Sequence, residues 1–134
     1  MGANDIQIGG THYKGSDLQV WDLGRYGVGF LEGSAVKYIT RWRKKNGRED
    51  IEKALHYIEK IKEEYRINGY RNPARNVSQD WELGQLAARF IQANQIEDDD
   101  EQVAITALIC WSRMQDIYTA EDAVCVLLRK NEIL

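Results

Sequence analysis

The amino-acid sequence predicts an all-α protein. Apolar residues recur three and four positions apart between residues 33 and 65, which is the spacing of one face of a helix. The same spacing returns after residue 78 in further segments. No stretch alternates apolar and polar residues in the way that a half-buried strand does. We therefore expect a helical hairpin as the core, a glycine-rich loop before it, and a C-terminal set of about three helices.

The predicted hairpin consists of two helices joined at residues 45–47. The first is expected to start at Gly33-Ser34 and to end with the cations up to Lys45. The second runs to about Arg66 and is stopped by Asn68-Gly69, because glycine readily adopts the left-handed conformation that ends a helix. Each helix carries an apolar stripe that the hairpin would bury: Ala35, Val36, Ile39 and Trp42 on the first, and Ala54, Leu55, Ile58 and Ile61 on the second.

The chain begins with an irregular segment that contains a glycine-bounded loop at residues 9–15. Glycines allow backbone N–H groups to approach a ligand closely, and the loop also carries His12, Tyr13 and Lys14. It is either a ligand-binding loop or an ordered turn whose Tyr13 packs against the hairpin. Residues 17–30 then predict a short helix, with inward-facing side chains at Val20, Trp21 and Leu23.

Residues 70–77 hold the single proline of the chain and predict a linker. It separates a first unit, residues 1–70, from a helical extension, residues 71–134. Within the extension, helices are expected around residues 83–91, at 103–114 behind the acidic run 98–101, and at 123–130 behind a capping box at 119–122. The extension either completes the core of the hairpin or forms a subunit interface.

Charge is unevenly distributed, although the formal net charge is only −3. Residues 31–75 carry twelve basic and seven acidic side chains, whereas residues 76–134 carry four and eleven. The basic middle would attract phosphate groups, and the acidic tail would repel them. The two regions would meet either within one molecule or across a subunit interface.

Composition places the protein among cytoplasmic globular proteins. A chain of 134 residues is long enough to bury a core without disulfides. No apolar run reaches the length of a membrane span, and the N-terminus lacks the basic start and apolar stretch of a secretory signal. Cys110 and Cys125 lie among apolar residues and are expected to be buried, reduced thiols. Nothing beside them has metal-ligand spacing, so we predict no metal site.

The polar faces of the two predicted helices indicate a phosphate-binding cleft. Lys37 and Arg41 are four residues apart and lie on one helix face. Asp50, Lys53 and Tyr57 follow along a face of the second helix. Cations in such a cleft neutralise phosphate oxygens. The alternative is that Arg41 and Asp50 only complement the dipoles of the helix ends at which they lie.

Short motifs in the first half carry a family resemblance. They are G-G-x-H-Y-K, then W-D, then G-x-x-x-K-Y-x-x-R, and then D-x-x-K-A-x-x-Y, all between about residues 7 and 65. The residues that form them are Gly9, Gly10, His12, Tyr13, Lys14, Trp21, Asp22, Gly33, Lys37, Tyr38, Arg41, Asp50, Lys53, Ala54 and Tyr57. This series resembles the SaV-like family of small tailed-phage proteins, many of them labelled nucleotide kinase. Two positions depart from the family pattern: Val20 replaces a common proline, and Ser34 replaces an asparagine and so loses its amide.

The resemblance implies a phage protein in the cytoplasm of an infected bacterium that acts as a nucleoside monophosphate kinase without a P-loop. The predicted phosphate- and nucleotide-binding residues are Gly10, His12, Tyr13, Lys14, Ser34, Lys37, Tyr38, Arg41, Lys53 and Tyr57. In a kinase, His12 or Asp50 would orient or deprotonate the acceptor, and Mg²⁺ is the cofactor to expect. The sequence offers no pair of carboxylates for that metal, which favours binding without turnover.

Three other functions use the same residues. A non-catalytic protein would sequester a nucleotide or inhibit a host defence enzyme. Single-stranded nucleic acid would bind through the basic run 41–48 with Trp42 stacking, although the acidic tail disfavours this function. In the fourth alternative the basic and aromatic residues only stabilise a helical oligomer. The expected partners are thus a nucleotide, further copies of the chain and a host protein, with no membrane.

Overall fold

The structure is a computed structural model that describes residues 18–133, with side chains up to residue 131. Every element in this range is a helix, so the predicted all-α fold is confirmed there. The loop at residues 9–15 lies outside the described residues. The elements, with η for a 3₁₀-helix, are η2 (Val20–Tyr26), α1 (Phe30–Arg41), α2 (Arg48–Asn68), η3 (Pro73–Asn76), α3 (Asp80–Ala93), α4 (Asp99–Cys110) and α5 (Met114–Ile133).

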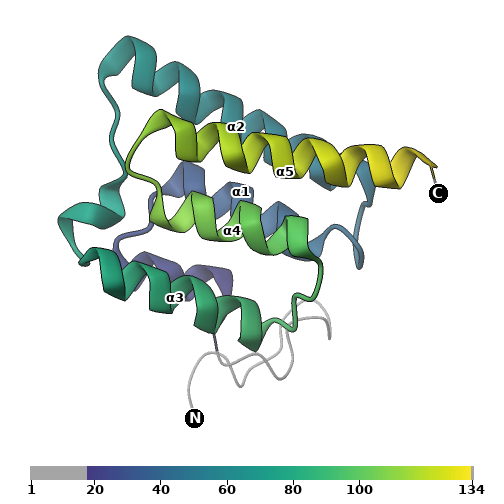
Figure 1. Ribbon diagram of the computed structural model, residues 1–134, viewed down its shortest axis with the longest axis horizontal. Coiled ribbons are helices and arrows are strands. Elements are labelled where there is room, and N and C mark those ends of the chain that lie inside the picture. The colour runs from purple at the N-terminus through teal and green to yellow at the C-terminus, as the bar shows by residue number, and fades with distance from the viewer. Residues whose placement is uncertain (1–17, 134) are drawn as a thin grey trace.

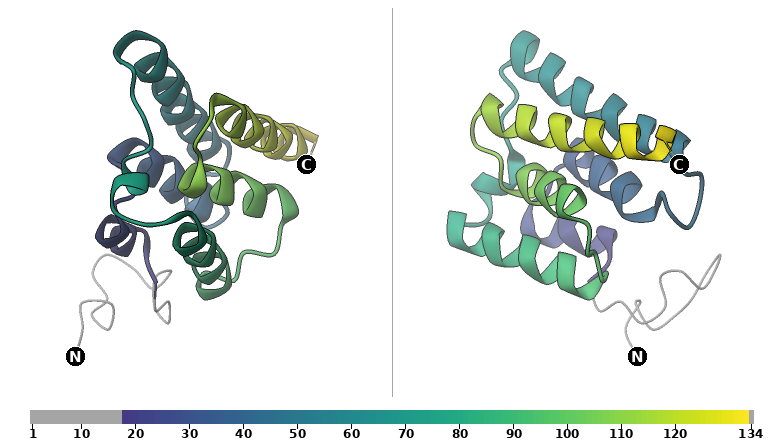
Figure 2. Two further views of the ribbon diagram at one scale, coloured as in Figure 1. Left: turned by 60° about the vertical axis from the view of Figure 1, so that its left-hand side comes forward. Right: turned by 45° about the vertical axis from the view of Figure 1, so that its right-hand side comes forward.

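The helices form two layers that correspond to the two halves of the chain (Figure 1). One layer contains η2, α1 and α2 in chain order, and the other contains α3, α4 and α5 (Figure 2). Across the layers, α1 packs against α4 and α2 packs against α5. Buried residues of both layers join in one hydrophobic cluster. The sequence left open whether the second half completes the core of the hairpin or forms a subunit interface. In the structure it completes the core.

Most of the predicted apolar stripes are buried between the layers. On the first helix and its turn, Ala35, Val36, Ile39 and Trp42 are buried as predicted, and on α2 so are Ala54, Ile58 and Ile61. Leu55 is only partly buried, and Ile51, which the prediction left out, is buried instead. Fully burying a valine or isoleucine side chain contributes about 1.5–3 kcal/mol, so these stripes help to hold the hairpin to the rest of the fold. The polar faces of α1 and α2 are left on the outside.

The first hairpin helix is displaced from its predicted position. It begins at Phe30 rather than at Gly33-Ser34, because the extended Gly29 accepts the N–H of Gly33 at 2.8 Å and closes the first turn. It ends at Arg41, and the turn covers residues 42–47, so it begins before the joint predicted at residues 45–47. At the far end of α2 the prediction is confirmed, since Gly69 takes φ 67° and stops the helix.

The predicted linker is built into the fold. Residues 73–76 form η3, and the buried side chain of Asn72 donates to the carbonyl oxygens of Ile109 at 3.1 Å and Trp111 at 2.9 Å. The guanidinium of Arg75 also donates to the carbonyl oxygen of Trp111, at 2.9 Å. Because these side chains fasten the segment to the end of α4, it cannot act as a flexible connection.

The acidic run before α4 caps that helix. Asp98 accepts the N–H of Glu101 at 2.9 Å, and the acidic first turn complements the positive end of the helix dipole, as predicted. The helix therefore starts at Asp99 instead of Val103 and ends at Cys110.

The start of the last helix also differs from the prediction. Asp116 accepts the N–H groups of Ser112 at 2.9 Å and Arg113 at 3.1 Å, so α5 begins at Met114. The capping box predicted at residues 119–122 is wrong. Thr119 lies inside the helix, where its hydroxyl donates to a backbone carbonyl one turn earlier.

Two predictions of burial are also wrong. Trp21 is 60% exposed on η2, whereas Leu23 in the same element is buried as predicted. Cys110 and Cys125 are free thiols, as expected, but both are only partly buried.

A buried carboxylate joins α1 to the second layer. Glu32 is inaccessible to solvent and accepts hydrogen bonds from the indole N–H of Trp111 at 2.8 Å and from the hydroxyl of Tyr70 at 2.8 and 3.0 Å. Burial raises the pKa of Glu32, and the two hydrogen bonds only partly oppose that effect. Burial and the neighbouring carboxylate likewise raise the pKa of Tyr70.

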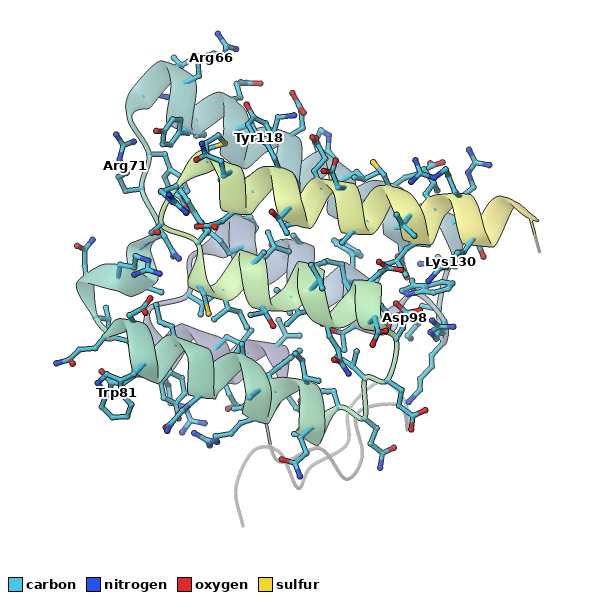
Figure 3. All side chains as sticks on the ribbon, in the orientation of Figure 1. Arg66, Arg71, Trp81, Asp98, Tyr118 and Lys130 are labelled. Atoms are coloured by element: carbon cyan, nitrogen blue, oxygen red, sulfur yellow. The ribbon has the colours of Figure 1, made fainter. Side chains whose placement is uncertain are left out.

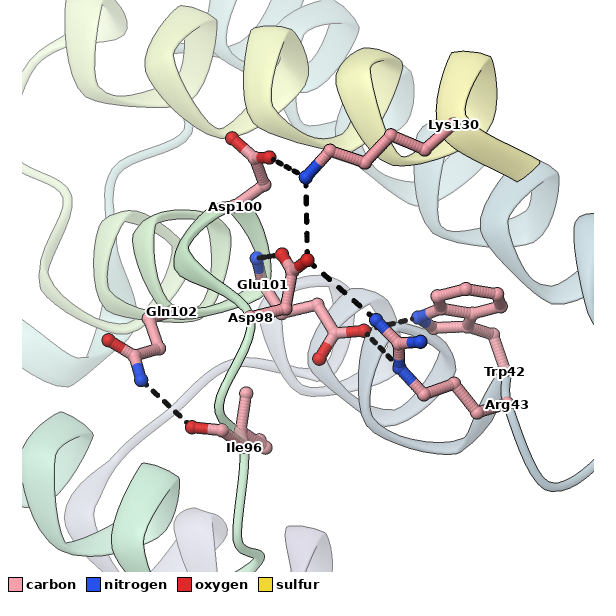
Figure 4. A network of polar contacts seen from close by, with 8 residues as sticks. All are labelled: Trp42, Arg43, Ile96, Asp98, Asp100, Glu101, Gln102 and Lys130. Atoms are coloured by element: carbon pink, nitrogen blue, oxygen red, sulfur yellow. Dashed lines mark hydrogen bonds and ion pairs between the residues drawn. The ribbon is translucent and has the colours of Figure 1, made fainter. Parts of the chain in front are cut away.

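The basic middle and the acidic tail meet within one molecule at the hairpin turn (Figure 4). The indole N–H of Trp42 donates to Glu101 at 2.6 Å, and Arg43 donates to the same carboxylate at 3.0 Å. Lys130 of α5 pairs with Asp98 at 3.4 Å, next to Arg43, which lies 3.7 Å from that carboxylate. This network fixes the turn of the hairpin against α4 and α5.

Candidate functional site

Three cations of the hairpin gather around one aromatic ring. The Lys37 ammonium lies 5.3 Å from the centroid of the Tyr38 ring, the Lys53 ammonium 5.4 Å, and the Arg41 guanidinium carbon 4.7 Å. Because all three groups lie within 5.4 Å of the same ring centroid, no two of them can be separated by more than twice that distance. The structure therefore brings together three of the four cations from which the sequence predicted a phosphate site. We call Lys37, Tyr38, Arg41 and Lys53 the cation cluster.

An aromatic row continues from the cation cluster. Tyr57 of α2 stacks on Tyr38 with ring centroids 5.9 Å apart and an interplanar angle of 15°. Phe30, the first residue of α1, makes a T-shaped contact with Tyr57 with ring centroids 6.1 Å apart, and His56 makes another with the same centroid distance. These rings hold the two helices together outside the main core, and they position Tyr38 among the cations.

Local helical geometry explains why these residues share one surface. Phe30, Ser34, Lys37, Tyr38 and Arg41 repeat at intervals of three and four, so they fall on the face of α1 opposite its buried stripe.

The second helix repeats this arrangement. Lys53 and Tyr57 are four residues apart on α2 and meet Tyr38 across the hairpin. Ser34 lies one turn before Tyr38 and is partly exposed, on the same surface as the cation cluster.

Asp50 lies beneath the cation cluster and is 0% exposed. Its two oxygens accept from the Arg41 guanidinium, each at 3.3 Å, and from the backbone and side chain of Asn46 at 3.2 and 3.3 Å. Burial acts to raise the pKa of Asp50, but the hydrogen bonds from Arg41 and Asn46 outweigh it and lower the pKa. A carboxylate so placed orients Arg41 and closes the hairpin turn. Its predicted part in catalysis stays a prediction.

Positive charge exceeds negative charge on this surface. The Arg41 charge is matched by Asp50, and Lys53 lies 3.4 Å from Glu49 in an exposed pair that contributes little. Among the described residues, Lys37 lies within ion-pair distance of no carboxylate. Like charges this close repel one another, and an anion at the surface would relieve that repulsion.

The remaining predicted site residues cannot be compared with this arrangement. Gly10, His12, Tyr13 and Lys14 all lie outside the described residues. The predictions of a histidine base and of a fourth cation therefore stay predictions. All predicted residues that the structure does describe, namely Ser34, Lys37, Tyr38, Arg41, Asp50, Lys53 and Tyr57, belong to the outer surface of the hairpin or its turn.

Sequence reasoning missed two residues that shape the site. Phe30 was not among the predicted site residues, yet it shares the helix face of Lys37 and contacts Tyr57. Its spacing of four from Ser34 was the available signal, and a misplaced helix start hid it. Asn46 was predicted only as part of a turn. Its spacing in the sequence does not indicate that its backbone N–H and its side-chain amide both donate to Asp50.

The rest of the basic run is engaged in the fold. Trp42 is buried and donates to Glu101, so its ring has no open face for stacking on a base. Arg43 pairs with Glu101 at 3.0 Å, and Arg48 pairs with Glu52 at 2.8 Å. Of the basic side chains from residue 41 to 48, Lys44 and Lys45 are exposed on the turn away from these pairs.

A separate groove of about 830 Å³ lies between α3, α4 and the start of α5. Its lining includes the small or apolar residues Gly84, Ala88, Val103 and Ala107, and also Arg113. None of the predicted site residues that the structure describes lines it. Within residues 18–133, no group of three or more His, Cys, Asp or Glu side chains is placed to hold a metal ion. Nor does this part of the chain contain a helix that is long and apolar enough to cross a membrane.

Comparison with known proteins bears on the first half of the chain. Residues 9–59 match a family described as "Protein of unknown function (DUF3310)", which is less than half of the chain. That stretch includes the cation cluster, Asp50 and Tyr57, as well as the loop at residues 9–15. No curated protein and no solved structure matches the chain. The matched region and the candidate site therefore coincide, and the family description assigns no activity to either.

Proposed function

We propose that the outer surface of the hairpin binds the phosphate groups of a nucleotide. The observation that carries this proposal is the gathering of Lys37, Arg41 and Lys53 around Tyr38, with Asp50 as a buried counter-charge to Arg41. Hydrogen bonds to charged groups contribute about 1.5–3 kcal/mol each, so two or three such contacts provide micromolar to millimolar affinity. Lys14 and the glycines of the N-terminal loop would add to the same site.

Binding is better supported than phosphoryl transfer. Asp50 is inaccessible, its oxygens are occupied by Arg41 and Asn46, and its pKa is lowered, so it is a poor acceptor for a proton from a substrate hydroxyl. His12 is the remaining base among the predicted residues. A kinase reaction would also need Mg²⁺ to neutralise charge on the transferred phosphoryl group. Kinase activity in an infected bacterial cell, which the family resemblance implies, is therefore the narrower form of this proposal.

Calorimetric titration with nucleoside monophosphates, nucleoside triphosphates and pyrophosphate tests the proposal. The decisive variant is Lys37→Ala/Lys53→Ala, and Lys44→Ala/Lys45→Ala is its matched control, because it removes the same charge from the exposed turn. We expect the first variant to weaken binding at least tenfold and the second less than twofold. Equal weakening by both would show that only overall charge matters.

A parallel assay of phosphate transfer from ATP, with and without Mg²⁺, separates an enzyme from a binding protein. Tight binding with no product would leave the binding function and remove the kinase. Absence of binding by every phosphate compound at low salt would refute the proposal as a whole.

A further inference from the structure

Phe30 is the most exposed large apolar side chain in the described part of the chain, at 77%. Full burial of a phenylalanine would contribute about 1.5–3 kcal/mol, and this fold forgoes that energy. The ring is nevertheless held in place. It stands on the first residue of α1 and meets Tyr57 at 6.1 Å with an interplanar angle of 76°.

Phe30 lies on the same surface of the hairpin as the cation cluster, which suggests a role for its exposed ring. Two ring-to-ring steps of 6.1 and 5.9 Å lead from Phe30 through Tyr57 to Tyr38, around which the cations gather. Along α1, seven residues separate Phe30 from Lys37, which corresponds to about 10 Å of helix. An exposed aromatic ring thus lies at one end of the surface, and the surplus positive charge lies at the other.

A nucleotide has the same order of features, with a flat aromatic base and a phosphate at opposite ends of one sugar. Resting on the proposed phosphate site, we infer that Phe30 is the platform on which the base of the bound nucleotide stacks. Ring surface is available for this contact, because Phe30 makes a single T-shaped contact with Tyr57 among the described rings and stays 77% exposed. Tyr38 and Tyr57 already stack on each other and serve as the floor between base and phosphate.

This arrangement predicts the specificity of the site. Stacking on an aromatic side chain tolerates every base, because every base has a π face. The protein should therefore prefer nucleotides to sugar phosphates while discriminating weakly among bases. Removing the ring should weaken the binding of nucleotides by about five- to 150-fold, the range that base stacking on an aromatic side chain supports. The binding of phosphate compounds without a base should not change.

Calorimetry with three kinds of probe tests the inference on the full chain. The probes are pyrophosphate, ribose 5-phosphate and the four 5′-monophosphates of adenosine, guanosine, cytidine and uridine. The variants are Phe30→Ala, Phe30→Trp as the conservative replacement, and Trp81→Ala as the matched control. Trp81 is 61% exposed and projects from α3, away from the hairpin (Figure 3). Circular dichroism of each variant checks that the helices are retained.

We expect Phe30→Ala to weaken the monophosphates by at least fivefold and to leave pyrophosphate unchanged, with Phe30→Trp and Trp81→Ala close to the wild type. The inference is overturned if Phe30→Ala binds the monophosphates as the wild type does, or if ribose 5-phosphate binds the wild type as tightly as they do. It is also overturned if pyrophosphate weakens in parallel, because the ring would then support the cations only. If neither pyrophosphate nor any monophosphate binds the wild type, the phosphate site itself fails and the platform with it.

Discussion

Replacing Glu32 tests whether a buried carboxylate is held in its charged form at a cost. In the Glu32→Gln variant, the amide oxygen can accept from the indole N–H of Trp111, and the amide N–H₂ can donate to the hydroxyl oxygen of Tyr70. Both polar partners keep a hydrogen bond to residue 32, with Tyr70 changing from donor to acceptor, while the buried charge is removed. We therefore expect the free energy of unfolding at pH 7 to stay within about 1 kcal/mol of the wild type or to rise.

The Glu32→Ala variant is the matched comparison. It leaves the fully buried indole N–H of Trp111 without its acceptor, which costs about 1–3 kcal/mol, and it adds a cavity. We expect a total loss of about 2–4 kcal/mol. Urea unfolding followed by tryptophan fluorescence measures both variants, since Trp111 itself reports on the site.

The pH dependence gives the sharper result. Burial raises the pKa of Glu32 above its usual 4.5, so the folded protein holds this proton at a pH where the unfolded chain has lost it. Stability from this group is complete below pH 4.5 and is lost as the pH rises through the folded pKa. Asp50, Asp98 and Asp116 have lowered pKa values and act in the opposite direction, so the difference between wild type and Glu32→Gln isolates Glu32. That difference should grow in favour of the variant from pH 4.5 upward. A constant difference, or a variant as unstable as Glu32→Ala, would refute the reasoning.

Two further predictions concern the scaffold. Gly29→Ala would place a Cβ atom 2.5 Å from a carboxylate oxygen of Glu32 and should destabilise the protein by about 1–3 kcal/mol, whereas Gly84→Ala meets open space within α3 and should stabilise it by about 0.5–1 kcal/mol. Urea unfolding of the pair checks this, and equal effects would contradict it. Trp42→Phe removes the 2.6 Å donor to Glu101 and should lower the free energy of unfolding by about 1.5–3 kcal/mol. An unchanged thermal midpoint would show that this hydrogen bond does not hold the hairpin turn.

Local patterns predicted the hairpin and the cation cluster, because both depend on helical periodicity. The spacing of four between Lys37 and Arg41 places their side chains on one face whatever the helix packs against. Helix ends were harder to predict. The start of α1 depends on the backbone of Gly29, and the start of α5 depends on Asp116 reaching back to two N–H groups. The sequence at residues 119–122 has the pattern of a capping box, but it lies inside α5 and does not start a helix.

Contacts between distant parts of the chain were beyond sequence reasoning. Glu32 bonds to Trp111 across 79 positions, and Trp42 bonds to Glu101 across 59. In the sequence, Glu32 is an unremarkable acid at a helix start, and Trp42 is an apolar residue beside four cations. Only the packing of α1 against α4 reveals that each polar atom has a buried partner. The same limit applies to Asp50. Its place at the positive end of the α2 dipole could be predicted from the sequence, but its burial beneath Arg41 could not.

The first layer carries the described site residues, and the second layer supplies partners for buried polar groups of the first. The described site residues all belong to the first layer, as does the described part of the region that matches the family of unknown function, residues 18–59. Yet its buried Glu32 and its Trp42 find their partners in the second layer, at Trp111 and Glu101. Without that layer, the apolar stripes of α1 and α2 would lose much of their cover, and the side chain of Glu32 would lose its bond to Trp111. A chain cut after residue 70 should therefore lack a cooperative thermal transition, and a fragment that melts cooperatively would show that the hairpin supports its own site.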